Sequence, residues 1–300
     1  MHPMEAKYFM LSLCRVGVVR GFSGVKVFFV CGAPKSGTTW LQRILDAHPQ
    51  VCCSGEGHFI TRFSSPVSKV VNTYNADLSV EAQQVYEGRP DYAPVTQAEF
   101  DDLVRVFVLR RLSARADGCT QWVGDKTPTY TRHLDQLHRL FPEAKVFHIV
   151  RDPRDVAVSR MGHQRRVGRF DGVSGSNPDL TIDSAIRLWK EALTAVDAFA
   201  VAHPGVVHEV CYHDLQSDPR GAMGPLFRFL GAASDAATIE PIAEATSFEA
   251  MTGRPRGQED PDSFLRKGVS GDWKTSLDAE AAQRIADNCG ELMREKRFVA

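Results

Sequence analysis

The chain has 300 residues, a formal net charge of −1 and 43% hydrophobic residues. This composition is enough to bury one large core. The near-neutral charge argues against a nucleic-acid partner, because domains that bind nucleic acids are usually strongly basic. We therefore expect a single domain over residues 26–300, preceded by an N-terminal extension over residues 1–25.

The N-terminal extension contains the apolar run from Phe9 to Val19, which is interrupted by Arg15 and is too short to span a bilayer. We expect neither a signal peptide nor a transmembrane segment, while peripheral contact with a membrane stays open. The seven cysteines are odd in number and lack metal-binding spacing. This pattern indicates reduced thiols in a cytoplasmic protein.

Further along the chain, short apolar runs alternate with helical periodicity. The runs predict strands over 26–31, 121–124, 144–150 and 206–211, and the periodic segments predict helices over 38–47, 96–115, 128–140, 153–163, 181–202, 219–230 and 279–289. The alternation predicts an α/β fold with a doubly wound, mainly parallel sheet flanked by helices. Segments 162–180 and 252–272 are rich in glycine and turn formers, so we expect loops there, either lids over a site or plain surface loops.

The first segment with candidate functional residues follows the predicted strand over 26–31. The turn Pro34–Thr39 collects Lys35, the hydroxyls of Ser36, Thr38 and Thr39, and Gly37 at the start of a helix. A helix N-terminus has free N–H groups and a positive dipole end, so this P-loop-like turn suits a phosphate or sulfate group. It differs from G-x-x-x-x-G-K-[ST] because Thr38 stands at the lysine position and Lys35 supplies the cation earlier. An ordinary strand-to-helix turn is the alternative.

A second segment repeats this arrangement after the strand at 144–150. Arg151 follows the strand directly, and Ser159 lies two turns along the next helix. Ligands bind at the carboxyl edge of open α/β sheets. An arginine and a hydroxyl there would suit a phosphate monoester. The alternative is that Arg151 pairs with Asp152 or Asp155 at the surface.

These segments together resemble a known family, the sulfotransferases that use 3′-phosphoadenosine 5′-phosphosulfate (PAPS). PKSGTTW is similar to the family's 5′-phosphosulfate-binding turn, and RDPRDVAVS to its 3′-phosphate motif. Residues 264–274 resemble RKG-x-x-GDWK, residues 212–215 resemble Tyr-Glu-Asp-Leu, and residues 246–251 resemble Ser-Phe-x-x-Met. The resemblance covers residues 26–275 in the expected order. It implies PAPS as co-substrate, 3′,5′-bisphosphoadenosine (PAP) as product, and no metal.

The resemblance also implies a set of nucleotide-binding residues. The 5′-phosphosulfate would be held by Lys35, Ser36, Gly37, Thr38 and Thr39, the 3′-phosphate by Arg151, Ser159, Arg266, Lys267 and Gly268, and the adenine by Trp40 and Phe248 with Tyr212 nearby. The aromatic residues would serve equally well as plain core residues.

For catalysis, Lys126 lies in Gly124–Pro128, which resembles the Lys-Thr/Ser-Pro segment of carbohydrate and tyrosylprotein sulfotransferases. A plain surface lysine is the alternative. The aryl and steroid enzymes carry a histidine in a Lys-Thr-His segment, where this chain has Pro128. Glu56 instead matches the glutamate base of the tyrosylprotein enzymes, and we expect partial burial to raise its pKa toward a useful value. A salt-bridged or helix-capping glutamate is the alternative; His58 is the reserve base and Asp125 a third choice.

The predicted activity is sulfuryl transfer from PAPS to a hydroxyl of a small molecule, carbohydrate or lipid. Glu56 would act as general base, while Lys35 and Lys126 would stabilise the leaving phosphate. One alternative is a P-loop small-molecule kinase using Mg-ATP, with Asp152 near the metal. The other is a non-catalytic nucleotide-binding protein. The acceptor and the oligomeric state stay open, because the family's dimerisation motif is not visible over residues 273–278.

Overall fold

The computed structural model describes residues 24–89, 91–171 and 177–298. The segment Phe9–Val19 and nearly all of the expected N-terminal extension lie outside these residues. The described strands are β1 (Lys26–Cys31), β2 (Val51–Gly55), β3 (Trp122–Lys126), β4 (Lys145–Val150) and β5 (Val207–Cys211). They form one sheet in the order β2-β3-β1-β4-β5, and all four pairings are parallel.

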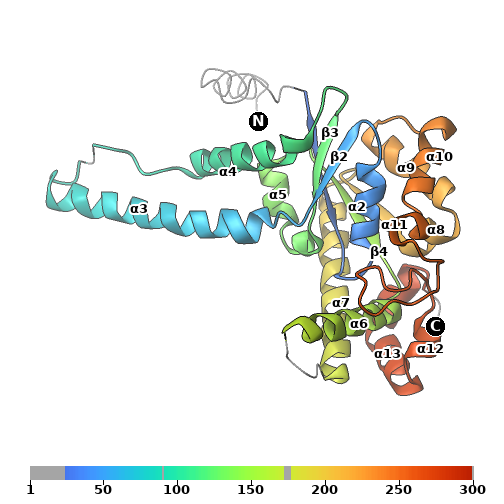
Figure 1. Cartoon of the computed structure of the whole chain (residues 1–300). Helices are drawn as coiled ribbons and strands as arrows, with labels where there is room; N and C mark the ends of the chain where they lie inside the picture. The colour runs from blue at the N-terminus through green and yellow to red at the C-terminus, as the bar shows by residue number, and fades with distance from the viewer. Residues whose placement is uncertain (1–23, 90, 172–176, 299–300) are drawn as a thin grey trace.

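Helices connect these strands and cover both faces of the sheet (Figure 1). Between β1 and β3 lie α2 (Thr38–Asp46), the π-helix η1 (Phe59–Ser64), α3 (Ser65–Gln84), α4 (Gln97–Leu112) and the short η2 (Ser113–Arg115). Between β3 and β5 lie η3 (Pro128–Arg132), α5 (Leu134–Leu140), α6 (Pro153–Asp171) and α7 (Pro178–Ala202). After β5 come α8 (Tyr212–Ser217), α9 (Pro219–Leu230), α10 (Ala236–Ala245), α11 (Phe248–Thr252), α12 (Trp273–Ser276) and α13 (Ala279–Glu295).

The central strand β1 divides the core into two layers. Successive side chains of a strand point to opposite faces. Phe28 accordingly packs with Leu41 of α2 and Phe227 of α9, whereas Phe29 packs with residues of α4, α5 and α7 on the other face. Both phenylalanines are fully buried. The predicted α/β fold with a doubly wound parallel sheet flanked by helices is therefore confirmed.

Several predicted boundaries were wrong. The edge strand β2 was not predicted, because its sequence VCCSG has little strand character. The helix α3 was not predicted either. It is a long helix that extends away from the body of the molecule (Figure 1) and buries only Ala82. The predicted helix over 128–140 is divided into η3 and α5.

The loop predicted over 162–180 is wrong at both ends, because α6 continues to Asp171 and α7 already begins at Pro178; its middle part, residues 172–176, lies outside the described residues. Contacts between the two helices stabilise this extension: Arg160 of α6 donates to Ser184 at 3.0 Å, and Thr181 of α7 donates to Gln164. The loop predicted over 252–272 is confirmed, since only turns and irregular backbone lie between α11 and α12.

Candidate active site

A cavity of about 380 Å³ lies at the carboxyl edge of the sheet. Its lining comes from the segments that follow the ends of β1, β2, β3, β4 and β5, together with the loop between α11 and α12. Of the residues expected from the sequence, it is lined by Lys35, Gly37, Thr38, Thr39, Trp40, Glu56, His58, Arg151, Ser159, Tyr212, Phe248, Arg266, Lys267 and Gly268. The fold therefore brings together nearly all of the expected site residues.

The turn after β1 has the geometry of an anion site. Gly37 has φ 102°, and a Cβ there would lie 2.5 Å from the ring of Tyr212, so the turn requires glycine. No side chain caps the N-terminus of α2, which begins at Thr38. The Ser36 hydroxyl is buried inside the turn and has no hydrogen-bond partner. A buried hydroxyl is normally paired, so this one keeps unused hydrogen-bonding capacity, although Ser36 itself does not line the cavity.

Lys35 carries its charge into the cavity. Its ammonium lies 4.2 Å from the centre of the Phe264 ring, in a cation–π contact. Burial, followed by the repulsion of Arg166 and Arg151, lowers the pKa of Lys35 from 10.5 to about 8. An anion bound beside Lys35 would relieve this repulsion and favour the charged form of the side chain.

Arg151 is fixed beside the turn, where its guanidinium donates to the Lys35 carbonyl at 3.4 Å. Its guanidinium lies 4.3 Å from the centre of the Tyr212 ring and donates to the Val269 carbonyl at 2.8 Å. Its Nε is buried without a partner. The surface pairing considered from the sequence is not formed, because Asp152 pairs with Arg154 at 2.7 Å and Asp155 accepts main-chain N–H groups. Arg151 thus keeps hydrogen-bonding capacity for a ligand.

The three aromatic residues of the site belong to both the core and the cavity. Trp40 and Phe248 are 8% and 6% exposed, and both line the cavity. Trp40 donates through its indole to the Thr246 carbonyl at 2.9 Å, and its ring meets Tyr212 edge-on at 5.4 Å. Gly268 has φ 68°, and a Cβ there would lie 2.3 Å from the Phe248 ring, so the backbone at Gly268 rests directly on this ring. The rings of Trp40, Tyr212 and Phe248 therefore form a fixed apolar wall of the cavity.

The carboxylate Glu56 and the ammonium of Lys126 form an ion pair. Parallel pairing of β2 and β3 sets Gly55 beside Lys126, and Lys126 Nζ then donates to Glu56 Oε1 at 2.6 Å. Lys126 is 3% exposed and lies outside the cavity lining, whereas the Glu56 side chain is 48% exposed. His58 Nε2 lies 3.6 Å from the other Glu56 oxygen.

This ion pair corrects the expected pKa of Glu56. Burial by itself raises that pKa, but the hydrogen bond and charge of Lys126, together with His58, outweigh burial and lower it. The salt-bridged form of Glu56, considered as the alternative, is therefore what the structure has, and the expected upward shift was wrong. A carboxylate with a lowered pKa stays ionised at neutral pH and so can accept a proton, but it is a weaker base than a carboxylate whose pKa lies near the working pH.

A buried hydrogen-bond network holds the turn that carries Glu56. Asp125 is 1% exposed. It accepts from the Gly57 N–H at 2.9 Å and from the hydroxyls of Thr127 and Tyr130, each at 2.8 Å. Glu56 itself adopts a left-handed backbone conformation with φ 55°. The carboxylate of Asp125, the third candidate base, is fully engaged in this support and does not line the cavity.

Several residues that line the cavity were not expected from the sequence. The polar and aromatic side chains among them are Thr129, Arg160, His163, Arg256, Phe264 and Asp272. Phe264 and Asp272 lie inside the segment 264–274 that resembles the family motif. His163 lies among Arg160, Arg165 and Arg166, a cluster of basic residues that was a local signal in the sequence. Burial, followed by the charges of Lys35 and Arg166, lowers the pKa of His163 to about 4.

The described residues provide neither a metal-binding cluster nor a membrane-spanning helix. Residues 24–89, 91–171 and 177–298 contain no group of three His, Cys, Asp or Glu side chains placed to hold a metal ion. No helix within the same ranges has the length and apolarity that a membrane span requires.

The chain matches known sulfotransferases in sequence and fold. It is 27% identical to zebrafish protein-tyrosine sulfotransferase 1 over 209 residues, covering 68% of this chain and 52% of that protein. It is 23% identical to cytosolic sulfotransferase 17 of Arabidopsis thaliana, covering 90% of this chain and 73% of that protein. Thus the chain spans only about half the length of the zebrafish relative.

Solved structures share the fold. Mouse sulfotransferase SULT7A1 complexed with PAP superposes with a TM-score of 0.53 at 17% identity, covering 90% of this chain and 85% of that one. The sulfotransferase domain from the curacin biosynthetic pathway also gives a TM-score of 0.53, at 20% identity, and covers 89% of this chain and 98% of that one. The model of the sulfotransferase family matches residues 28–236, more than half of the sequence, and the chain therefore belongs to the sulfotransferase family.

Proposed function

We propose that this protein transfers a sulfuryl group from PAPS to a hydroxyl acceptor. The observation that carries the proposal is one cavity lined by the turn of Lys35, by Arg151 with Ser159, and by Glu56. The Lys35 turn and the pair of Arg151 and Ser159 would each bind one anionic end of a 3′,5′-substituted nucleotide. Glu56 would accept the proton of the acceptor hydroxyl. The mouse structure complexed with PAP supports the choice of nucleotide.

The donor would be held by groups that are already in place. The Ser36 hydroxyl and the Arg151 Nε are buried without partners, which fits them to phosphate oxygens at the 5′ and 3′ ends respectively. The N-terminus of α2 adds its positive dipole end to the charge of Lys35. The apolar wall of Trp40 and Phe248 would pack against the base.

Catalysis would consist of positioning and proton acceptance. PAPS supplies an activated sulfuryl group: the acceptor oxygen forms a bond to sulfur while the bond from sulfur to the 5′-phosphate breaks. Glu56 would accept the hydroxyl proton, and Lys35 would offset the charge that develops on the phosphate. Lys126 would keep Glu56 ionised through their 2.6 Å contact. Because Lys126 lies outside the cavity lining, we assign it this supporting role and leave the charge on the departing phosphate to Lys35.

With Glu56 as the base, the protein would belong with the glutamate-dependent members of the family. The protein-tyrosine sulfotransferase relatives support this placement. The acceptors to screen are hydroxyls of small molecules, carbohydrates and lipids, with peptide tyrosines added because of these relatives. We further propose that residues 26–300 form one domain, and that the protein works in the cytoplasm, since its six described cysteines are free thiols.

The kinase alternative has less support. Asp152, its candidate metal ligand, is held by the Arg154 guanidinium through both carboxylate oxygens. The Thr38 side chain, at the position of the usual P-loop lysine, carries no charge for an ATP phosphate.

Nucleotide binding and mass spectrometry together test the proposal. PAP should stabilise the protein in thermal-shift assays more than Mg-ATP does, and the effect should survive a chelator. Arg151→Ala should weaken PAP by roughly 10- to 100-fold, from the loss of a charge-assisted hydrogen bond. Arg187→Ala, an exposed arginine paired with Glu191 on α7, is the matched control. Stronger stabilisation by Mg-ATP, or no mass gain of a sulfuryl group on any screened acceptor, would overturn the proposed activity.

A further inference from the structure

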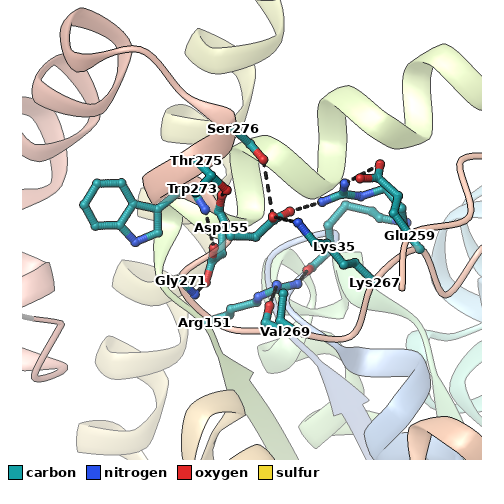
Figure 2. Close-up of polar contacts among 12 residues, drawn as sticks. Lys35, Arg151, Asp155, Glu259, Lys267, Val269, Gly271, Trp273, Thr275 and Ser276 are labelled. Atoms are coloured by element: carbon teal, nitrogen blue, oxygen red, sulfur yellow. Dashed lines mark hydrogen bonds and ion pairs between the residues drawn. The ribbon is translucent and has the colours of Figure 1, made fainter. Parts of the chain in front are cut away.

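The start of α6 and the loop before α12 are joined by one buried carboxylate. Asp155 of α6 is 1% exposed. One of its oxygens accepts from the Gly271 N–H at 2.7 Å, and the other accepts from the Trp273 N–H at 3.1 Å. Figure 2 shows Asp155 between these two residues. A segment more than a hundred residues away in the sequence is thus tied to α6 by two charge-assisted hydrogen bonds.

Asp272, the residue between Gly271 and Trp273, forms ion pairs with two cations of the loop. Lys267 Nζ donates to Asp272 at 2.5 Å, and Arg266 donates to its other oxygen. The Ser276 hydroxyl adds a third contact at 3.3 Å. The Asp272 side chain is 2% exposed, so this carboxylate is a fixed anchor beneath the two cations. Arg266 and Lys267 both line the cavity.

Arg151 adds a second tie between the same two segments. It precedes α6 and donates to the Val269 carbonyl at 2.8 Å, as Figure 2 also shows. Asp155 and Ser159 are four residues apart on α6, so they lie on the same side of the helix. The main chain from Val269 to Trp273 is therefore docked along the helix that carries Ser159.

We propose that Asp155 is a positioning residue of the nucleotide site, which sets Arg266 and Lys267 against Arg151 and Ser159 so that the four converge on one phosphate. The identification of that phosphate as the 3′-phosphate of PAP rests on the proposed function. Asp155 does not line the cavity and acts through the main chain at Gly271 and Trp273. Without this tie the cations would have to be ordered when the ligand binds, and the ordering would cost affinity.

Asp155→Asn tests this role with little change in shape. Both atoms that approach the carboxylate are N–H donors, so an amide can accept from only one of them and presents its own NH₂ to the other. Calorimetry should show PAP bound about tenfold more weakly, as expected for the loss of one charge-assisted hydrogen bond. The affinity for adenosine 5′-monophosphate, which has no 3′-phosphate, should stay unchanged.

Two comparisons separate positioning from general damage. Asp235→Asn is the matched control, because Asp235 also accepts a main-chain N–H at a helix start but lies outside the cavity. It should leave both affinities unchanged. In the Arg266→Ala/Lys267→Ala background, Asp155→Asn should cause no further loss of PAP affinity. The proposal would be overturned if Asp155→Asn lowered the affinities for PAP and adenosine 5′-monophosphate equally. It would also be overturned if Asp155→Asn lowered PAP affinity by the same factor in the Arg266→Ala/Lys267→Ala background as in the wild type.

Hydrogen exchange gives a readout that does not depend on the nucleotide. In Asp155→Asn the amides of residues 268–275 should exchange faster, while those of β1 and β4 keep their protection. Unchanged exchange over 268–275 would overturn the positioning role even if PAP binds. If the wild type shows no preference for PAP, the proposed function fails, and the exchange result still decides the role of Asp155. Should Asp155→Asn not fold, Asp155→Glu moves the carboxylate by one methylene and allows the same comparisons.

Discussion

Donor binding should weaken as the pH rises through about 8, because Lys35 loses its proton there. The pKa of Lys35 is lowered from 10.5 to about 8 by burial and by the nearby guanidinium groups of Arg166 and Arg151. Only the protonated ammonium attracts the 5′-phosphate of PAP. The affinity is therefore fully present well below pH 8 and is lost progressively as the pH rises through that value.

The size of the effect follows from this pKa. With a pKa of about 8, Lys35 is about 90% protonated at pH 7 and about 10% protonated at pH 9. The dissociation constant of PAP should therefore rise about tenfold between these pH values, or about 1.4 kcal/mol. The phosphates of PAP are already largely dianionic at pH 7, since their second pKa is about 6, so they do not cause this change.

Calorimetry with PAP at several pH values between 7 and 9 is the assay, and Lys35→Arg is the decisive variant. Arginine stays charged throughout this range, so Lys35→Arg should give a flat profile. Lys145→Arg, whose lysine lies outside the cavity, is the matched control and should follow the wild type. A flat wild-type profile, or the same decline in Lys35→Arg, would refute the reasoning.

Three further outcomes are expected. Glu56→Gln should lower kcat by roughly 10²–10⁴-fold in steady-state assays, because it removes the base but keeps the size of the side chain. Its affinity for PAP should stay near that of the wild type. If Glu56→Gln keeps full turnover and His58→Ala is inactive, His58 is the base. Asp125→Asn should cost about 1.5–3 kcal/mol in urea denaturation, since a buried charged acceptor of three hydrogen bonds is lost; an unchanged midpoint would contradict the supporting role. Phe147→Ala should cost about 3–5 kcal/mol in the same measurement, because the ring is fully buried between the sheet and α9; a loss below 1 kcal/mol would show that this core readily collapses around the gap.

The sequence alone determined the parts of the site whose signals are local. The apolar run of β1, the turn with Lys35 and Gly37, and the periodicity of α2 are contiguous, so the boundaries of this strand, turn and helix were predicted almost correctly. Arg151 was placed at the end of β4 for the same reason. The resemblance to the sulfotransferases added the segment 266–268, which the structure brings to the same cavity.

Long-range packing decided the rest. β2 is a strand because its backbone pairs with β3, and its own residues give little sign of this. That pairing puts Lys126 against Glu56 and turns the expected rise in the Glu56 pKa into a decrease, which no local pattern around either residue indicates. In the same way, Asp155 meets Gly271 only because α6 and the loop before α12 pack together at the edge of the sheet. Strand propensity and helical periodicity are properties of neighbours along the chain, whereas the charge of a buried group depends on neighbours in space, and the tertiary structure alone supplies these.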